Sequence, residues 1–300
     1  MKISVVIVSK NRSNDLTHCL GSLLSQSIVL DQLILIDNNS TDKTKEIFSN
    51  FAKNSQIPCK YVLEKRKGYP TVYNRGLKEA KNTWVAFIDD DCVADVDWYE
   101  SIKKELLSLD INTEIVAILG NSQTYYKNNL FSLLTLFKDK IWKGSKIKKN
   151  KVLDFEILDN KNIVYNKNFL IKNKLSFDES RVRFFNGASE DCDLGMQIFE
   201  KKGKAKYLPE MLVFHKDPHS SFQFYRKIYF STLGHIKYEE KWSNFRKNNL
   251  AINHDFNFFR FTMSFMNENK LSFLQKVLFA VNLLLMAFLL KGIKFYVKSF

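Results

Sequence analysis

The chain has 300 residues, 45% of them hydrophobic and 26% charged, so it is long enough to bury a full core and is not a small module held together by disulfides. Its formal net charge of +14 predicts an anionic partner or surface. Lipid or phosphate is the natural counter-charge.

The four cysteines stand alone in the sequence, without any Cys-x-x-Cys pair. This spacing argues against a zinc site or a disulfide framework and fits a reducing cytosol. The first residues enter a strand at once, without the basic and apolar segments of a signal peptide. We therefore expect a cytoplasmic protein.

Apolar runs alternate with helical patterns through the first 90 residues. The predicted strands are Ile3–Val8, Leu33–Ile36, Tyr61–Leu63 and Trp84–Ile88. Helical patterns follow Arg12 and Asp42, and a third covers Thr71–Ala80. Four such strands alternating with helices predict an α/β fold, with a Rossmann-like, mostly parallel central sheet and helices on both faces.

Acidic residues follow two of the predicted strands. Asp37 ends the second strand, and Asp89, Asp90 and Asp91 end the fourth. Carboxylates about 3 to 5 Å apart cannot all stay ionised without a cation, and hard oxygen ligands suit Mg²⁺ or Mn²⁺. Because ligands of such sheets bind beyond the carboxyl ends of the strands, we expect a divalent metal and a phosphorylated ligand there. The alternative for the triplet is an acidic turn before a helix that begins near Asp97.

The second half of the chain is less regular. A strand is predicted over Ile115–Leu119, a short helix over Leu130–Phe137, and a solvated loop over the lysine-rich residues 138–151. A further helix begins at Glu190 and stops at Gly203. Acids in a first helical turn complement the helix dipole, so ordinary helix-start chemistry is an alternative to a catalytic role for them.

An uncharged, apolar stretch covers residues 277–290 near the C-terminus. As a helix it would measure only ~21 Å, whereas a membrane span needs ~20 residues. Lys276 and Lys291 flank it. Two interpretations remain open, a membrane-associated hairpin or interfacial helix and a core or dimer helix.

Short motifs occur in a fixed order along residues 1–240. They are Ser4–Arg12, Leu35–Asp42, Gly68–Pro70, Asn74–Gly76, Phe87–Asp91, Asn162, Phe177–Glu179, Glu190–Leu194 and His215. In this order they resemble the family 2 glycosyltransferases of the GT-A fold, which transfer a sugar from a nucleotide diphosphate donor to an acceptor hydroxyl. The resemblance implies a catalytic domain at 1–240, with a nucleotide-sugar half at 1–120 and an acceptor half at 121–240. The remaining residues, 241–300, would form a helical, membrane-associated extension.

The resemblance also implies a role for each matched residue. The residues expected to contact the nucleotide sugar are Ser9, Asn11, Arg12, Asp37, Asn39, Asp42, Gly68, Asn74, Asp89 and Asp90. The ligands expected for Mg²⁺ or Mn²⁺ are Asp91, Asp89 and His215. The acceptor side is expected to include Asn162 and Glu190. Asp191 would be the base that deprotonates the acceptor hydroxyl, and in-line attack with a single base implies inversion at the anomeric carbon.

The chain departs from the family pattern in two places. Relatives often carry Arg-Asn where this chain has Tyr73 and Asn74, so an arginine contact to the diphosphate must come from Arg75, Arg66 or elsewhere. The Q-x-x-R-W signature of processive synthases is absent after Gly203. We therefore expect one sugar to be transferred per encounter.

Three other functions are alternatives to this one. A nucleic-acid-binding protein would explain the charge, but no aromatic residues are interleaved with the lysines as stacking platforms. A sugar-phosphate nucleotidyltransferase should carry a Gly-rich phosphate loop after the first strand, where this chain has Ser9–Arg12. A non-catalytic relative used in assembly is a third alternative, which the retention of all the acids argues against.

The expected partners are a nucleotide diphosphate sugar, a glycan or lipid-linked acceptor, and an anionic membrane surface, without nucleic acid. Five lysines and no acid follow Glu268, which favours a peripheral location at the cytoplasmic face of a membrane. The expected setting is the assembly of cell-surface polysaccharide, O-antigen or glycolipid. Oligomeric state is left open.

Overall fold

A computed structural model describes residues 1–110, 113–144, 158–183, 188–249 and 258–298. The chain separates into two compact units, residues 1–123 with 147–215 and residues 124–146 with 216–300, and each is described by itself. The domain limits expected at residues 120 and 240 stay predictions.

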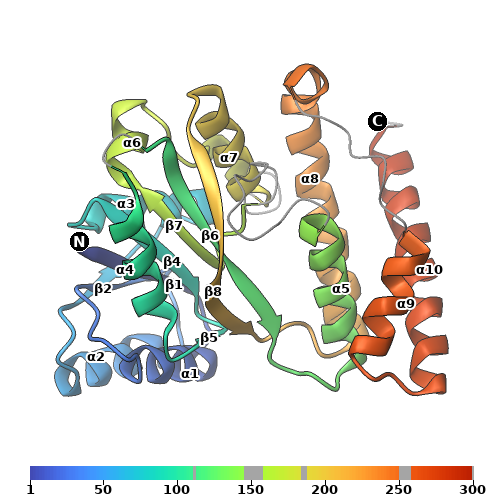
Figure 1. The fold of residues 1–300 in the computed structure, drawn as a ribbon, viewed down its shortest axis with the longest axis horizontal. Coiled ribbons are helices and arrows are strands. Elements are labelled where there is room, and N and C mark those ends of the chain that lie inside the picture. Colours follow the sequence, from blue (N-terminus) through green and yellow to red (C-terminus); the bar gives the residue numbers. More distant parts are fainter. Residues whose placement is uncertain (111–112, 145–157, 184–187, 250–257, 299–300) are drawn as a thin grey trace. The chain divides into compact units, whose positions relative to one another are not determined.

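The first unit is built on an eight-stranded sheet with the order β3-β2-β1-β4-β7-β6-β8-β5 (Figure 1). The strands are β1 (Ile3–Ser9), β2 (Leu33–Asp37), β3 (Cys59–Leu63), β4 (Trp84–Asp89), β5 (Cys92–Ala94), β6 (Ile115–Thr124), β7 (Asn162–Asn166) and β8 (Lys204–His215). Pairing is parallel from β3 to β4. It is antiparallel where β7 joins β4 and β6, and where β5 joins β8. The predicted parallel sheet is thus the first half of a larger, mixed one.

Helices cover both faces of this sheet, as the alternation of apolar runs and helical patterns predicts. The helices of the first unit are α1 (Ser13–Leu24), α2 (Thr44–Asn54), α3 (Tyr69–Glu79), α4 (Trp98–Ser108), α6 (Lys167–Lys172) and α7 (Glu190–Glu200), with a 3₁₀ turn, η2 (Glu179–Arg183). Successive side chains of a strand point to opposite faces. Accordingly, Ile3, Val5 and Ile7 of β1 lie in a core with α1, α2 and α4, whereas Val6 lies in a second core with α3, α6 and α7.

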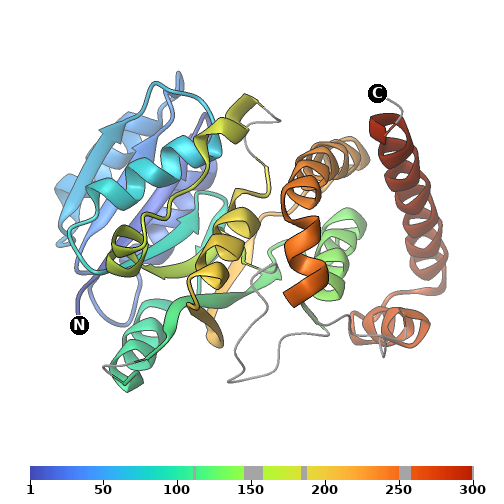
Figure 2. The same cartoon turned by 90° about the horizontal axis from the view of Figure 1, so that it is seen from above.

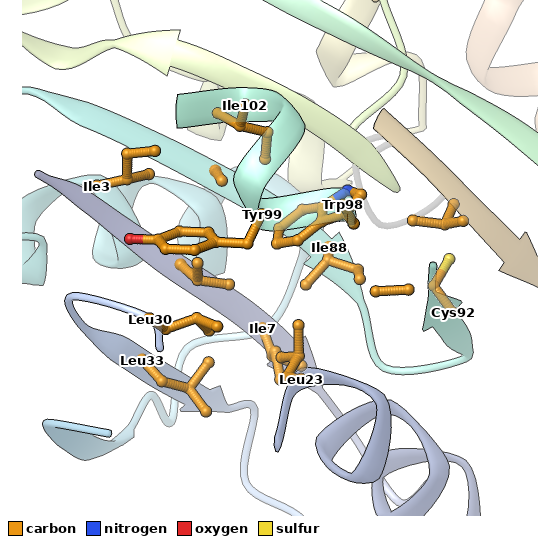
Figure 3. Close-up of a cluster of buried hydrophobic side chains, with 14 of the residues drawn as sticks. Ile3, Ile7, Leu23, Leu30, Leu33, Ile88, Cys92, Trp98, Tyr99 and Ile102 are labelled. Atoms are coloured by element: carbon orange, nitrogen blue, oxygen red, sulfur yellow. The ribbon is translucent and has the colours of Figure 1, made fainter. Parts of the chain in front are cut away.

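The first core is closed by two aromatic side chains at the start of α4. Trp98 and Tyr99 are fully buried and lie among apolar side chains of β1, β2 and β4 (Figure 3). Their polar atoms find partners, because the Tyr99 hydroxyl donates to Asp31 at 2.6 Å and the Trp98 indole donates to Asn162 at 2.8 Å. Large aromatic residues thus fill the core without leaving a buried donor unpaired.

The second unit is helical in its described residues. It consists of α5 (Leu130–Gly144), α8 (Ser221–Asn249), α9 (Phe258–Glu268) and α10 (Phe273–Lys298), drawn from green to red in Figure 2. Their shared core includes Leu133, Phe137, Phe224, Phe265 and Phe279. The predicted loop at 138–151 is wrong in its first half, because α5 continues to Gly144. The lysines of this segment favour a helical backbone and can stay exposed to solvent, so the helix continues through them. Residues 145–151 lie outside the described residues.

The C-terminal helix is longer than the apolar stretch that predicted it. It runs over Phe273–Lys298, since Lys276 and Lys291 interrupt the hydrophobicity without interrupting the helix. Within it, Phe273–Phe295 is long and apolar enough to cross a membrane, judged by length and composition alone, and 6% of this window is buried. The apolar C-terminal helix expected for a membrane-associated tail is therefore present.

Two glycines allow a matched test of how tightly α3 packs on the sheet. A Cβ at Gly76 would lie 2.8 Å from Val6 Cγ1 and 3.0 Å from the Phe87 ring, whereas a Cβ at Gly21, on α1, meets nothing within 4 Å. We expect Gly76→Ala to lower the free energy of unfolding by about 1 to 3 kcal/mol, because the close approach of helix and sheet is lost. Gly21→Ala should raise it by up to about 1 kcal/mol through helix propensity. Urea denaturation measures both, and equal effects of the two variants would contradict the packing argument.

Candidate active site

The carboxyl ends of three parallel strands meet at one edge of the sheet. The register of β1 with β2 pairs Ser9 with Asp37, and that of β1 with β4 pairs Val8 with Asp89. The structure thus brings together the ends of the strands that carry the acidic residues singled out in the sequence.

Asp89 ends β4, and Asp90 and Asp91 form the turn to β5. Short strand β5 does not pair with β4 but with β8, in a register that sets Cys92 opposite His215. His215 Nε2 consequently lies 3.3 Å from Asp91 Oδ1. Asp91, Cys92 and His215 offer ligand atoms that all lie within 4.8 Å of one another, so this turn is a candidate metal site.

Arg12 faces the triplet with its positive charge. Its Nη1 lies 3.1 Å from Asp90 Oδ1 and also pairs with Asp91 Oδ2. The charge of Asp91, followed by those of Asp90 and Asp89, raises the pKa of Arg12 above its ordinary value against the opposing effect of burial. The loop after β1, expected to line the nucleotide pocket, therefore also neutralises part of the candidate metal site.

The carboxyls of the triplet are held in an unfavourable environment. Burial, followed by the charge of Asp91, raises the pKa of Asp89 to about 6. Burial also raises the pKa of Asp90 to about 7, although Arg12 opposes this effect. Their ionised forms need more positive charge than Arg12 alone supplies.

A second pair of acids begins α7. Ser189, directly before the helix, has a left-handed backbone with φ of 65°, which is uncommon for a residue other than glycine. Burial, followed by the charge of Asp159, raises the pKa of Asp191 to about 6. Burial and the charge of Asp191 raise the pKa of Glu190 well above its ordinary value. Asn160 Nδ2 donates to Glu190 Oε1 at 3.3 Å.

The loops after β1 and β2 are fastened to each other. The Asn11 amide donates to Ser40 Oγ at 2.9 Å, and Asn11 Oδ1 accepts from the Thr41 amide at 2.7 Å. Asp42 Oδ2 accepts from the Ser13 amide at 2.9 Å. Asn11 and Asn39 adopt left-handed φ values of 52° and 59°, a conformation that asparagine tolerates well.

Asp37 is almost fully buried at the base of these loops. Its Oδ2 accepts from the Tyr61 hydroxyl at 2.6 Å, and its Oδ1 accepts from the Ser40 amide at 2.8 Å. A carboxylate has about four acceptor positions, so it retains capacity for a donor from a ligand.

Two residues predicted to contact a ligand instead bind other parts of the protein. Asn162 is 1% exposed. Its amide donates to the carbonyls of Asn121 and Met211, each at 2.8 Å, and accepts from Trp98. The Asn74 side chain donates to the Phe177 carbonyl at 2.8 Å and accepts from the Phe177 backbone amide at 3.0 Å. Both side chains tie elements of the fold together, and their contacts lend no support to the roles predicted for them.

Gly68 also acts through the backbone. It precedes α3 with φ of 106°, and a Cβ there would lie 2.5 Å from Val182 Cγ2. Only glycine combines this conformation with this close approach. Its expected place beside the nucleotide sugar stays a prediction.

Tyr73, Asp159 and Lys161 line the acid cluster although no motif in the sequence marks them as site residues. The Tyr73 hydroxyl lies 3.3 Å from Asp89 Oδ1, at the position where relatives often carry arginine. Asp159 forms an ion pair of 2.8 Å with Lys161, whose carbonyl accepts from the Asp89 amide at 3.4 Å. Residues 159–161 could have been recognised only by their position directly before the strand that begins at Asn162.

Comparison with known proteins identifies the family. The family model described as "Glycosyl transferase family 2" matches residues 4–175, which is more than half of the chain. The chain belongs to glycosyl transferase family 2. Chondroitin synthase of Escherichia coli is 26% identical over 72% of this chain and 35% of its own length. Poly-beta-1,6-N-acetyl-D-glucosamine synthase of Staphylococcus epidermidis is 31% identical over 43% of this chain and 30% of its own. The chain thus spans about a third of the length of the curated relatives it matches.

Solved structures show the same fold for this family 2 chain. The mannosyltransferase PcManGT of Pyrobaculum calidifontis, in complex with GDP-Man and Mn²⁺, is 14% identical, with a TM-score of 0.57 over 80% of this chain and 64% of its own. Residues 1–349 of Staphylococcus aureus TarS are 16% identical, with a TM-score of 0.56 over 84% of this chain and 76% of that one. The predicted GT-A fold, with its central sheet and covering helices, is confirmed.

The raised pKa of Asp90 has a consequence for the stability of this family 2 protein. Between the unfolded value of 3.8 and the folded value of about 7, the folded state holds a proton that the unfolded state has released, so stability falls as the pH rises through this window. In chelator at pH 8, Asp90→Asn should therefore raise the melting temperature, by an amount that shrinks as the pH falls towards 5. Arg12 keeps its pairing with Asp91 in this variant.

Thermal unfolding at several pH values measures this effect. The control is Asp97→Asn, which removes an exposed carboxylate and should show no comparable pH-dependent gain. A gain for Asp90→Asn that is the same at pH 5 and pH 8 would contradict the electrostatic explanation.

Proposed function

We propose that this protein is a metal-dependent, inverting glycosyltransferase that moves a single sugar from a nucleotide diphosphate sugar to an acceptor hydroxyl. One observation carries the proposal: the aspartate triplet and His215, together with the Glu190–Asp191 pair, gather at one edge of a GT-A sheet. The solved structures of the same fold include proteins in complex with GDP-Man and Mn²⁺ and with UDP-GlcNAc.

The residues present fit a divalent ion. Asp91 offers a hard oxygen and His215 an imidazole nitrogen, the ligand types that suit Mn²⁺. Cys92 does not fit, because burial raises the pKa of its thiol well above the ordinary value and its Sγ points at the Lys161 carbonyl, 3.8 Å away. Asp91 and His215 would therefore hold Mg²⁺ or Mn²⁺, with Asp89 beside them. When bound, the ion would stabilise the negative charge that grows on the leaving nucleoside diphosphate.

The two loops after β1 and β2, which are joined by hydrogen bonds, would form the part of the pocket that binds the nucleotide. Asn11, Asn39 and Asp42 lie on these loops, Ser9 ends β1, and Asp37 would accept a hydrogen bond from the base. Because hydrogen bonds already join the two loops, the pocket would be formed before the donor arrives. Arg12 would offer its guanidinium to the diphosphate as the carboxylates turn to the metal.

Asp191 is the proposed base. Its carboxyl, with a pKa of about 6, is ionised at neutral pH yet more basic than an ordinary aspartate, which suits general-base catalysis. Glu190, whose pKa is raised well above its ordinary value, would keep its proton and act as a hydrogen-bond donor on the acceptor side. A single base, with no second nucleophile in the proposed set, leads to inversion at the anomeric carbon.

The acceptor is proposed to be a glycan or a lipid-linked glycan. Two relatives are named as synthases of chondroitin and of a poly-N-acetylglucosamine, which supports a role in the assembly of cell-surface polysaccharide, O-antigen or glycolipid. A nucleotidyltransferase is less well supported, because the loop after β1 carries Arg12 rather than a glycine-rich sequence.

Removal of the metal ligand tests the donor site directly. Asp91→Asn should abolish the rise in melting temperature that UDP or GDP sugars give in the presence of Mn²⁺, because the diphosphate loses its counter-ion. A panel of nucleotide sugars, each with Mn²⁺ or with chelator, identifies the donor by thermal shift. Asp97→Asn is the matched surface control. A donor-induced shift that is the same in chelator would contradict the metal assignment.

Removal of the base should separate chemistry from binding. We expect Asp191→Asn to lower turnover by roughly 10² to 10⁴ while the thermal shift with donor and Mn²⁺ is preserved. In the wild type, kcat/KM should rise with pH through about 6, as the carboxyl ionises. Sugar transfer from the donor found in the panel to a membrane extract measures both. Glu200→Gln, at the far end of the same helix, is the control, and wild-type turnover in Asp191→Asn would contradict the assignment.

A further inference from the structure

Helix α10 carries two apolar stripes on opposite sides. The inner stripe packs in the core of the second unit and includes Phe279, Leu283, Met286 and Leu290. The outer stripe is formed by Phe273, Leu274, Val281, Leu284, Leu285 and Phe288, which are between 45% and 84% exposed. At 3.6 residues per turn these side chains share one face of the helix, roughly a third of its circumference. An exposed apolar surface of this kind marks an interaction site.

Lysines border the outer stripe on one side. At helical spacing, Lys276, Lys291 and Lys294 all fall along the same flank. Long lysine side chains in this position keep their charged ends in the headgroup region while the apolar stripe enters the acyl chains. No acid follows Glu268 in the sequence, so the complementary surface is anionic.

Helix α8 runs beside α10 in the same direction. The Tyr225 hydroxyl donates to Asn282 Oδ1 at 2.7 Å, and further along both helices Lys294 Nζ lies 3.6 Å from Glu239 Oε2. The α8 segment between these contacts, 225–239, carries charged side chains. They are Arg226, Lys227, Lys237 and Glu239.

This pairing opposes a transmembrane orientation of α10. As a span, Phe273–Phe295 would measure ~35 Å, enough for a hydrocarbon core of about 30 Å. It would carry the adjacent α8 segment to the same depth, where each charged side chain costs about 2.5 to 3.5 kcal/mol on insertion scales. With the inner stripe packed against protein, only the outer stripe is left for lipid.

We propose that α10 binds in the plane of an anionic membrane, with its outer stripe in one leaflet, and does not cross the bilayer. This deepens the lipid-linked acceptor of the proposed function, and its observations come from the second unit alone. A second copy of the chain is the less suitable occupant of the stripe. Pairing two such faces would bring two lysine-rich borders together, because α10 carries no acid of its own and Glu239 of α8 is already paired with Lys294.

Vesicle binding tests whether a membrane is the partner of the outer stripe. The full-length protein should sediment with phosphatidylglycerol-containing vesicles, and much less with pure phosphatidylcholine or in high salt. Leu284→Glu with Phe288→Glu should weaken binding by about tenfold or more, whereas Leu107→Glu should not, although Leu107 is similarly exposed on α4. Equal binding by the double variant, or a stable dimer of the wild type that excludes vesicles, overturns the proposal.

Labelling tests the orientation. Glu268→Cys and Lys291→Cys, each in a Cys59→Ser background, place a thiol near either end of α10, and the remaining cysteines are buried. When the protein is synthesised in the presence of the anionic vesicles, a membrane-impermeant maleimide should label both positions from outside. Protection of one position until detergent is added would show a span and overturn the proposal.

The thermal shift with the panel of UDP and GDP sugars and Mn²⁺ separates this inference from the proposed function. Vesicle binding without a donor shift would leave the membrane inference standing and remove the transferase assignment. A donor shift without vesicle binding would do the reverse.

Discussion

The crowding of carboxyl groups at one edge of the sheet is the constraint on which the rest of the first unit depends. Asp89, Asp90 and Asp91 share that edge with Glu190 and Asp191, and burial makes the ionised forms of Asp89, Asp90, Glu190 and Asp191 costly. Folding alone would not favour such an arrangement. It persists because two apolar cores hold the strands in register from both faces, and because Arg12 and His215 supply partial compensation. The site is thus destabilised locally and supported by packing elsewhere, as is common where function requires it.

Sequence reasoning correctly placed the acids that end the parallel strands at one edge of the sheet. A strand that ends in Asp37 and a neighbouring strand that ends in Asp89 must present both at the same edge, so local periodicity was sufficient there. The contacts of Asn162 and Asn74 were not accessible in this way. They depend on β7, β8 and residues 177–179, which lie far along the sequence from the elements they contact. These segments join the sheet as antiparallel strands or pack against it as irregular chain, so local periodicity does not reveal their contacts. Asp159 and Lys161 escaped notice for the same reason, since only the tertiary fold brings them against the Asp89 backbone.

The second unit shows a different limit of pattern reading. A stretch of 14 uncharged residues marked the apolar centre of α10 but not its ends, because helix termini follow hydrogen bonding and lysine is compatible with a helix. Because the stretch is apolar on all sides, its sequence also did not show that one stripe packs against protein while the other is exposed. Only the packing of Phe279 and Leu283 against neighbouring helices shows which side is occupied by protein and which is left to another partner.

The order of strands in the sheet has a consequence for how the site is completed during synthesis. The aspartate turn leaves the sheet at β4, in the fourth position, and re-enters it at β5, in the eighth, where its partner is β8. The residues opposite β5 are Val213–His215, at the end of the last strand of the unit. A nascent chain can therefore form the nucleotide-side strands early, yet it cannot anchor both ends of the aspartate turn until more than 200 residues have left the ribosome. The metal site proposed at this turn would therefore be completed late in translation, in one step with closure of the sheet.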